Sequence, residues 1–258
     1  MQMTRGSPDT DKAARSGLPN RSWALEQRSP VGPQVHAILR SQIVQGELAP
    51  GATLSEADIA QRFSTSRQPV REAFIKLSEE GLLEVRPQRG TFVRKVDKVA
   101  IIDARFVREA IEADIVKELA VAPSADLVEE LRALLVAQAA VPVNRIFDFM
   151  KLDERFHKTL AAAAGRSYAW KVIESVKVQM DRVRYLSLRT FPKQRLVRQH
   201  MAIVDAIEHV KPEDAEREMR AHLRVILNDL PHIEEQHPEF FTPSREGPER
   251  PLPGTVIG

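Results

Sequence analysis

Apolar residues recur every three or four positions through much of residues 96–230, the spacing that places them on one face of a helix. Leu127, Leu131, Leu134 and Leu135 show this pattern, and Gly165 is the only glycine between residues 91 and 246. With this glycine and the few prolines of the region as boundaries, the pattern predicts about six helices, at residues 98–121, 124–139, 144–164, 167–190, 194–210 and 212–230. We therefore expect the back half of the chain to be an all-helical bundle.

The first hundred residues show a different order of elements. The pattern predicts helices at residues 34–46, 56–63 and 67–80 and two short strands at residues 83–86 and 91–94. A three-residue turn, Ser64-Thr65-Ser66, separates the second and third helices. This is the order of a winged helix-turn-helix, in which the helix after the turn enters the DNA major groove. The predicted fold class is mainly α, with an N-terminal winged helix-turn-helix, including a small β-hairpin wing, ahead of a C-terminal helical bundle.

The third helix carries side chains suited to DNA recognition. Arg67 and Arg71 are four residues apart and share a face, and Gln68 lies beside them. Arginine can pair with guanine and glutamine with adenine, and either can hold a phosphate. Ser66 is placed to cap this helix, whose N-terminal end favours a phosphate. A surface helix with solvated arginines would show the same residues, but the turn and the hairpin in order favour DNA binding.

Composition and charge fit this division. The chain has 258 residues (29.1 kDa) and no cysteine, which excludes a disulfide framework, a thiolate nucleophile and a cysteine-based zinc site. Residues 1–95 carry 14 Lys and Arg against 10 Asp and Glu, whereas the remainder carries 24 against 26. A basic front half is consistent with a polyanion partner. The sequence shows no secretory signal and no membrane-spanning apolar run, so we expect a cytoplasmic protein.

Both ends of the chain lack hydrophobic periodicity. Residues 1–29 are mostly polar, and six of the 17 prolines fall in residues 231–258. We expect residues 1–29 and 232–258 to be disordered tails. The DNA-binding domain is then predicted at residues 30–96 and the helical domain at residues 97–231.

Four residues of the back half are placed to form a metal site. Asp153 and His157 are four apart on one predicted helix and project from one face. His200 and His222 each lie eleven residues from Lys211, which puts both about 16 Å from the turn of an antiparallel helix pair. Three histidines and a carboxylate suit a borderline divalent ion, with Zn²⁺ expected first and Mn²⁺ or Ni²⁺ as alternatives. The alternative for each histidine is a core side chain satisfied by hydrogen bonds.

Several short motifs connect the N-terminal domain to a known family. They are residues 54–74, Leu77, Glu80-Gly81-Leu82 and residues 89–93. Together they resemble the DNA-binding domain of GntR-family regulators, with one departure at Ser64, where the family often has glycine. The resemblance implies base or phosphate contacts for Arg67, Gln68 and Arg71 and a wing tip at Arg89 and Gly90.

The back half carries its own set of motifs. They are residues 108–112, 153–160, 200–207 and 215–223. These segments resemble the FCD ligand-binding domain of the FadR subfamily, so that the likeness covers about residues 34–230. It implies that Asp153, His157, His200 and His222 hold a metal. Six rather than seven helices in this domain would place the chain near the VanR-like branch.

The two halves together predict a ligand-responsive transcriptional regulator. The resemblance implies a homodimer on a palindromic operator, usually a repressor, whose effector is a small organic acid. Arg108, Arg182 and Arg184 are the candidates to pair with the carboxylate of that effector. The main alternative is a metal-dependent hydrolytic enzyme, because a three-histidine, one-aspartate site could activate water. No further general base or nucleophile is evident, however, and the winged helix would be unexplained. A purely architectural DNA binder would leave the metal residues without a role.

Overall fold

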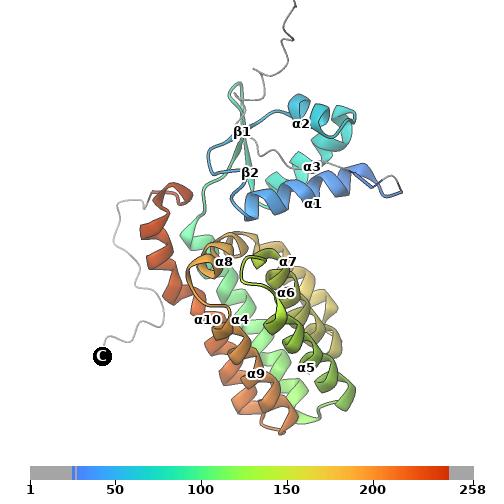
Figure 1. Ribbon diagram of the computed structural model, residues 1–258, viewed down its shortest axis with the longest axis vertical. Coiled ribbons are helices and arrows are strands. Elements are labelled where there is room, and N and C mark those ends of the chain that lie inside the picture. Colours follow the sequence, from blue (N-terminus) through green and yellow to red (C-terminus); the bar gives the residue numbers. More distant parts are fainter. Residues whose placement is uncertain (1–24, 27, 244–258) are drawn as a thin grey trace, which may run out of the picture.

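Short helices and a small sheet form the N-terminal domain, seen above the helical bundle in Figure 1. The computed structural model describes residues 25, 26 and 28–243, so residues 1–24, 27 and 244–258 of the predicted tails lie outside the described residues. The elements of this domain are α1 (Val31–Val44), β1 (Thr53–Leu54), α2 (Glu56–Arg62), α3 (Arg67–Glu79), β2 (Leu83–Arg86) and β3 (Gly90–Val93). The three strands are antiparallel in the order β1-β3-β2.

The turn between α2 and α3 depends on a left-handed residue. Ser64 has a φ of 51°, a conformation that glycine adopts with less strain than serine. Ser55 caps α2, since its Oγ accepts a hydrogen bond of 3.3 Å from the amide of Asp58. Ser66 occupies the N-cap position of α3, but its side chain makes no capping hydrogen bond. The predicted start of the recognition helix is therefore right, whereas the predicted side-chain cap is absent.

The wing is a hairpin with a third strand beside it. β2 and β3 pair from Leu83–Val93 to Arg86–Gly90, as the two predicted strands require. The tip turns through Gln88 and Gly90, whose φ values are 60° and 108°. The third strand, β1, was not predicted, because two residues are too few to show the alternation typical of a strand.

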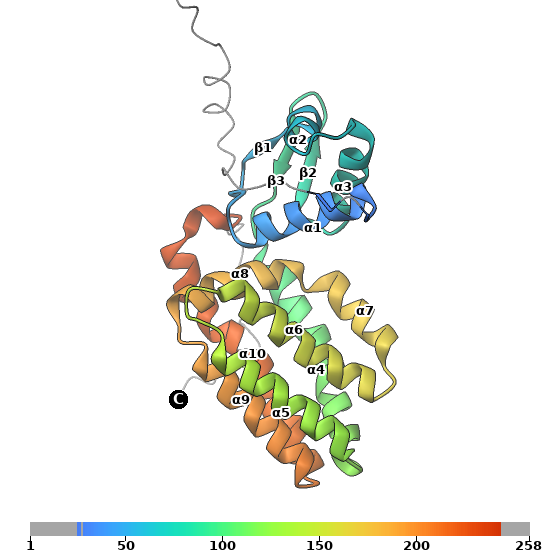
Figure 2. The same ribbon diagram turned by 45° about the vertical axis from the view of Figure 1, so that its right-hand side comes forward.

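The bundle consists of helices only, among the residues that the structure describes, which confirms the predicted fold class. They are α4 (Lys98–Val121), α5 (Ala125–Ala140), α6 (Ile146–Ala163), α7 (Ser167–Val176), α8 (Val178–Thr190), α9 (Gln194–Glu208) and α10 (Pro212–Gln236). In the bundle α4 packs against α6, α9 and α10, and α5 packs against α6 and α9 (Figure 2). None of the described helices is both long enough and apolar enough to cross a membrane.

The predicted helix at residues 167–190 is interrupted at one residue. Lys177 ends α7 and precedes α8, and its ammonium group contacts Asp181 at 2.6 Å and Glu154 at 3.0 Å. Apolar periodicity continues through this point, which is why the sequence predicts one helix. The assignment to the VanR-like branch depended on the helix count and stays a prediction.

The predicted end of the helical domain at residue 231 is wrong. α10 continues through Pro231 to Gln236, and a 3₁₀ turn, Pro238–Phe240, follows it. Proline removes one helical hydrogen bond, but Leu230 and Ile233 on either side are buried in a cluster with Val96 and Phe241. Burial of these side chains keeps the helix intact beyond the proline. Residues 232–243 are therefore part of the fold.

The two domains meet through α6 and α8. Met150 of α6 and Val178 of α8 are buried in the core of the N-terminal domain, with side chains such as Leu39 and Phe74. This shared core fixes the DNA-binding domain directly on the end of the bundle.

Candidate metal centre and nucleic-acid interface

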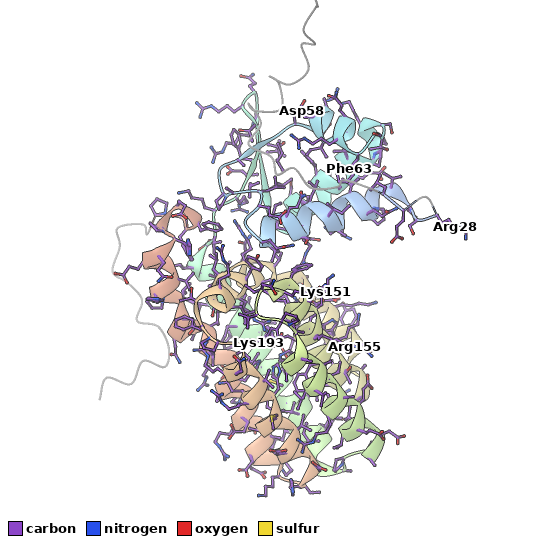
Figure 3. All side chains as sticks on the ribbon, viewed as in Figure 1. Arg28, Asp58, Phe63, Lys151, Arg155 and Lys193 are labelled. Atoms are coloured by element: carbon purple, nitrogen blue, oxygen red, sulfur yellow. The ribbon has the colours of Figure 1, made fainter. Side chains whose placement is uncertain are left out.

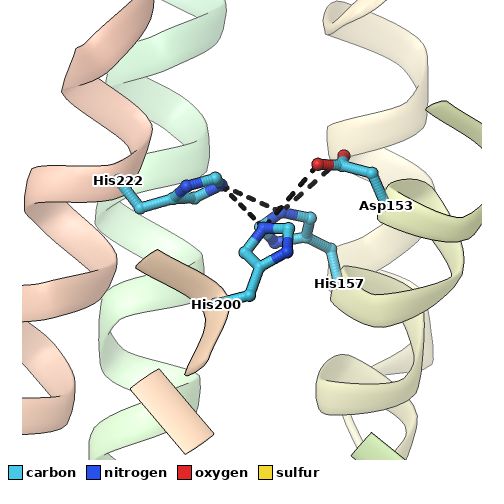
Figure 4. Close-up of side chains that lie close together, drawn as sticks. All are labelled: Asp153, His157, His200 and His222. Carbon is cyan, nitrogen blue, oxygen red and sulfur yellow. Dashed lines mark hydrogen bonds and ion pairs between the residues drawn. The ribbon is translucent and has the colours of Figure 1, made fainter. Parts of the chain in front are cut away.

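Three helices bring the four predicted ligand residues to one point inside the bundle (Figure 4). Asp153 and His157 face inward from α6 one turn apart, and α9 and α10 contribute His200 and His222. All four are buried, with exposed fractions between 0 and 5 %. One ligand atom from each lies within 4.8 Å of all the others. The α9–α10 hairpin thus places its two histidines at the same level, as their equal distance from Lys211 predicts.

An oxygen atom stands beside the Nδ1 atom of each histidine ring. His157 Nδ1 lies 2.5 Å from Glu112 Oε2, His200 Nδ1 2.9 Å from Gln138 Oε1 and His222 Nδ1 3.2 Å from Gln199 Oε1. Because a carboxylate or amide oxygen can only accept a hydrogen bond, the ring proton of each neutral histidine belongs on Nδ1. Each Nε2 atom then presents an unprotonated lone pair to the centre, as metal-binding histidines do.

The spacing of these atoms fits one divalent ion. His222 Nε2 lies 3.2 Å from His200 Nε2 and 3.3 Å from His157 Nε2. Atoms that share an ion at about 2.1 Å are separated by about 3.0 Å at a right angle and about 3.4 Å at the tetrahedral angle. Asp153 Oδ1 lies 3.6 Å from His200 Nε2 and, although buried, accepts no hydrogen bond from the described residues. Converging lone pairs and an unsatisfied carboxylate oxygen are what a cation would stabilise, so this cluster can hold a metal ion.

Burial and neighbouring charge keep His200, His222 and Asp153 in their metal-binding protonation states. Burial lowers the pKa of His200 to about 3, and burial together with the adjacent histidines lowers the pKa of His222 well below its ordinary value. Burial alone would raise the pKa of Asp153, but the Arg184 guanidinium holds it well below 3.8. His200 and His222 are therefore neutral and Asp153 is ionised at neutral pH.

Of the three arginines predicted to bind an effector, the structure places two beside the metal centre and one away from it. Arg184 lies 2.6 Å from Asp153 Oδ2, and Arg108 pairs with Glu112 at 2.6 Å. Both line a cavity beside His222, with about 470 Å³ of empty space, part of it open to solvent. Arg182 does not join them: its Nη1 donates to the carbonyl of Arg94 at 2.8 Å, at the base of the wing. Arg184 and Arg108 are thus placed to meet a ligand of the metal centre, and Arg182 is not.

The predicted DNA-contacting side chains lie on a free surface of the other domain. Arg67, Gln68 and Arg71 on α3 are exposed, as are Arg89 and Gly90 at the wing tip. Side chains of α2 and α3 extend into solvent on the side away from the bundle (Figure 3). Arg67 makes only a long contact with Glu56, at 3.7 Å, and Gln68 donates to Glu72 at 3.0 Å. These weak partners leave the side chains available to a nucleic acid.

Comparison with known proteins decides the family. Residues 32–93 match the bacterial regulatory proteins of the gntR family, and residues 103–225 match the FCD domain. Over 220 residues the chain is 38 % identical to the HTH-type transcriptional repressor RspR of Escherichia coli K12, covering 84 % of this chain and 96 % of RspR. The chain belongs to the GntR family of transcriptional regulators and has an FCD C-terminal domain.

Other GntR proteins agree with this assignment. The gluconate operon transcriptional repressor of Bacillus subtilis is 28 % identical over 188 residues, 70 % of this chain and 77 % of the repressor. A GntR transcriptional regulator from Rhodococcus sp. RHA1 has a crystal structure that matches with a TM-score of 0.65 at 26 % identity, covering 78 % of this chain and 97 % of that one. These relatives are transcriptional regulators and not enzymes. This GntR protein is accordingly a DNA-binding regulator, and the hydrolase alternative is set aside.

The sequence interpretation missed the residues that surround the metal ligands. Glu112, Gln138 and Gln199 orient the three histidines, and Gln138 is itself fixed by donating to the carbonyl of Leu152 at 3.2 Å. Gln138 sits at a buried helical position, which is an unusual place for a polar side chain. This buried helical position is the feature of the sequence that could have identified Gln138. Glu112 lies in the motif at residues 108–112, which assigned it no role, and nothing in the residue pattern distinguishes Gln199 from an ordinary surface residue.

Proposed function

We propose that this GntR protein is a metal-dependent repressor that binds a palindromic operator as a homodimer and releases it when a small organic acid binds. The observation that supports the metal-dependent part is the convergence of three unprotonated Nε2 atoms and Asp153 beside Arg184. Two related repressors, RspR and the gluconate operon repressor, support the sign of regulation. Because the target is chromosomal, the protein would act in the cytoplasm.

The metal would be held by Asp153, His157, His200 and His222. Imidazole nitrogen with one carboxylate oxygen suits Zn²⁺ first, and Mn²⁺ or Ni²⁺ also fit this donor set. The ion would supply a Lewis-acidic position that accepts a carboxylate oxygen. Glu112, Gln138 and Gln199 keep the three rings in their ligating orientation.

The effector would be a small carboxylate because two arginines, Arg108 and Arg184, line one cavity with His222, one of the metal ligands. Arg184 is charge-paired with Asp153 and Arg108 with Glu112, so both guanidinium groups already lie at the edge of the centre. A carboxylate that reaches the ion would compete with Asp153 for Arg184. The gluconate operon repressor is named for the operon of a sugar acid, and gluconate is itself a small carboxylate.

The homodimer follows from the size of a winged-helix contact. One recognition helix reads only a short half-site, and two-fold symmetry doubles the number of bases that are read. In each protomer Arg67, Gln68 and Arg71 would contact bases or phosphates in the major groove. Arg89 and Gly90 would bring the wing tip to the backbone beside it.

The test begins with protein purified without chelators or a histidine tag. Its metal content is measured, its operator is selected from a random duplex pool, and DNA release is followed during titration with a panel of organic acids. We expect about one ion per chain, a dimer on DNA, and release by at least one acid only in the metal-loaded protein. If no metal copurifies and added Zn²⁺, Mn²⁺ and Ni²⁺ leave the melting temperature unchanged, the four residues are not a metal site.

A further inference from the structure

The chain segment after α10 turns back onto the linker between the two domains. The amide of Val96 donates to the carbonyl of Phe240 at 2.7 Å, and the carbonyl of Val96 accepts from the amide of Thr242 at 3.0 Å. Val96 and Phe241 form a parallel bridge, and both side chains are buried. Figure 1 shows the red end of α10 rising to this position. The segment lies beyond the FCD match, which ends at residue 225.

The same segment also contacts the DNA-binding domain. Gly46 follows α1 with a φ of 73°, and a Cβ atom placed on it would lie 3.0 Å from Cζ of Phe240. The aromatic ring therefore packs directly on the backbone of Gly46, where a side chain would crowd the ring. This short segment thus has three contacts. Its Phe241 packs in the bundle, its backbone bonds to Val96 of the linker, and its Phe240 packs on Gly46 of the DNA-binding domain.

Hydrogen bonds hold the linker between the two domains at three residues. The carbonyl of Arg94 accepts from Arg182 on α8, Val96 is bonded on both sides to the C-terminal segment, and the carboxylate of Asp97 caps α4 by accepting from the amide of Val99 at 2.9 Å. Hydrogen bonds to the N–H and the C=O of one residue fix the adjacent φ and ψ angles, which are the only soft torsions of a linker. These contacts act together with the shared core at Met150 and Val178 to set the angle between the domains.

We propose that residues Pro238–Thr242 are a strap that fixes this angle and so determines which half-site spacing the dimer accepts. The expected effect on half-site spacing rests on the dimer proposed above. Two rigidly held recognition helices match one separation of half-sites, since these must lie about one helical turn, or about 34 Å, apart. If the domain could swing, different spacings would be accepted at similar affinity. Phe240 is a positioning residue in this scheme and does not touch DNA.

The chain offers a matched pair of truncations. A chain ending at Gln236 loses the strap, whereas a chain ending at Pro243 keeps it and loses only residues 244–258. Phe240→Ala is the milder variant, because the backbone bonds to Val96 stay and only the ring on Gly46 is removed. Far-UV circular dichroism and metal content verify that each variant keeps its fold and its centre.

The first readout needs no DNA. Because the chain lacks cysteine, Gln61→Cys on α2 and Glu129→Cys on α5 give a single pair of spin-label sites in each chain, and labelled chains are diluted with unlabelled ones. We expect a narrow distance distribution in the full chain and in the chain ending at Pro243. The chain ending at Gln236 should give a broad distribution and Phe240→Ala an intermediate one. Equal widths in all four proteins would overturn the strap.

The second readout uses a half-site selected from random duplexes and arranged as inverted repeats whose spacers differ by one base pair. We expect the full chain to prefer one spacer by about tenfold, the size of one mismatched base pair. The chain ending at Gln236 should bind all spacers within a few-fold. An unchanged preference in this variant contradicts the proposal. Failure of the full chain to bind any duplex contradicts the proposed function instead, and the distance distributions then decide by themselves whether the strap holds the domains.

Discussion

The two domains place their functional side chains in opposite environments. On α3, Arg67 and Arg71 point into solvent, and the Arg67 side chain is 70 % exposed. In the bundle, the Arg108 side chain is 3 % exposed and every histidine of the centre is buried against a polar partner. An exposed recognition face costs the fold almost nothing, whereas a buried polar group is tolerated only when partners compensate its lost hydration. Substitutions on the DNA-binding face should therefore leave the stability of the fold nearly unchanged. Substitutions in the metal centre should change stability as well as function.

The charges of the bundle show how this compensation is achieved. Burial alone would raise the pKa of Glu112, but the charge of Arg108 and the hydrogen bond from His157 lower it to about 2. Asp153 is held ionised by Arg184 in the same way. The centre is therefore a connected network of ion pairs, in which removing one member leaves another buried charge without its partner.

The largest effect that would sharpen this comparison is expected at a metal ligand. His200→Ala removes one of the four ligands and the ring that stacks on Phe156 at 4.3 Å. We expect loss of stoichiometric metal and a free energy of unfolding lower by roughly 2–5 kcal/mol, the range for truncation of a large buried side chain. Elemental analysis and urea denaturation measure both. The control is His209→Ala at the exposed end of α9, and wild-type metal content in His200→Ala would contradict the assignment.

A smaller effect of a different kind is expected on the recognition face. Arg71→Ala should weaken operator binding by roughly 1–3 kcal/mol at fixed salt if the side chain contacts a base. The melting temperature should stay close to that of the wild type, because an exposed side chain contributes little to stability. Fluorescence anisotropy and a thermal melt test the two halves of this statement, with exposed Arg155→Ala on α6 as the control. Unchanged affinity in both Arg67→Ala and Arg71→Ala would remove α3 as the reading element.

The smallest effect per step of the experiment is the dependence of stability on pH, at most about 1.4 kcal/mol per pH unit for one titrating group. The unfolded chain takes up a proton at His200 near pH 6.5, whereas the folded chain does so only at about pH 3. The unfolded state therefore binds more protons between these values, and the free energy of unfolding of metal-free protein should fall as pH decreases from 6.5 towards 3. Urea denaturation at several pH values with chelator measures the slope. His200→Gln should flatten it, and an equal slope in wild type and His200→Gln would contradict the prediction.

Local patterns account for the parts of the fold that could be predicted from the residues alone. The helix-turn-helix and its hairpin follow from apolar spacing, from Ser64 and from Gly90, all of which act within a few residues. Asp153 and His157 share a face because they are four apart on one helix, and His200 and His222 share a level because of their distance from Lys211. Each of these relations is geometric and holds before any other element packs.

The features of the fold that were not predicted from the sequence also have physical reasons. β1 is too short to show a period, and the break at Lys177 leaves the apolar spacing unchanged. α10 passes Pro231 because Leu230 and Ile233 are buried against Val96 and Phe241, which lie far away in the sequence or beyond the helix end. A rule for helix ends that uses only neighbouring residues cannot include that burial.

Arg182 and Arg184 show where the information in the sequence ends. Both are arginines on α8, and successive residues of a helix are turned by about 100°, so positions two apart point to different sides. That difference in direction is already contained in the residue order, as are the helix faces and the spacing of the histidines. Packing alone determines that one direction meets Asp153 of the metal centre and the other the carbonyl of Arg94. The same holds for Glu112, Gln138 and Gln199, because the orientation of a histidine ring depends on which oxygen a distant helix places beside it.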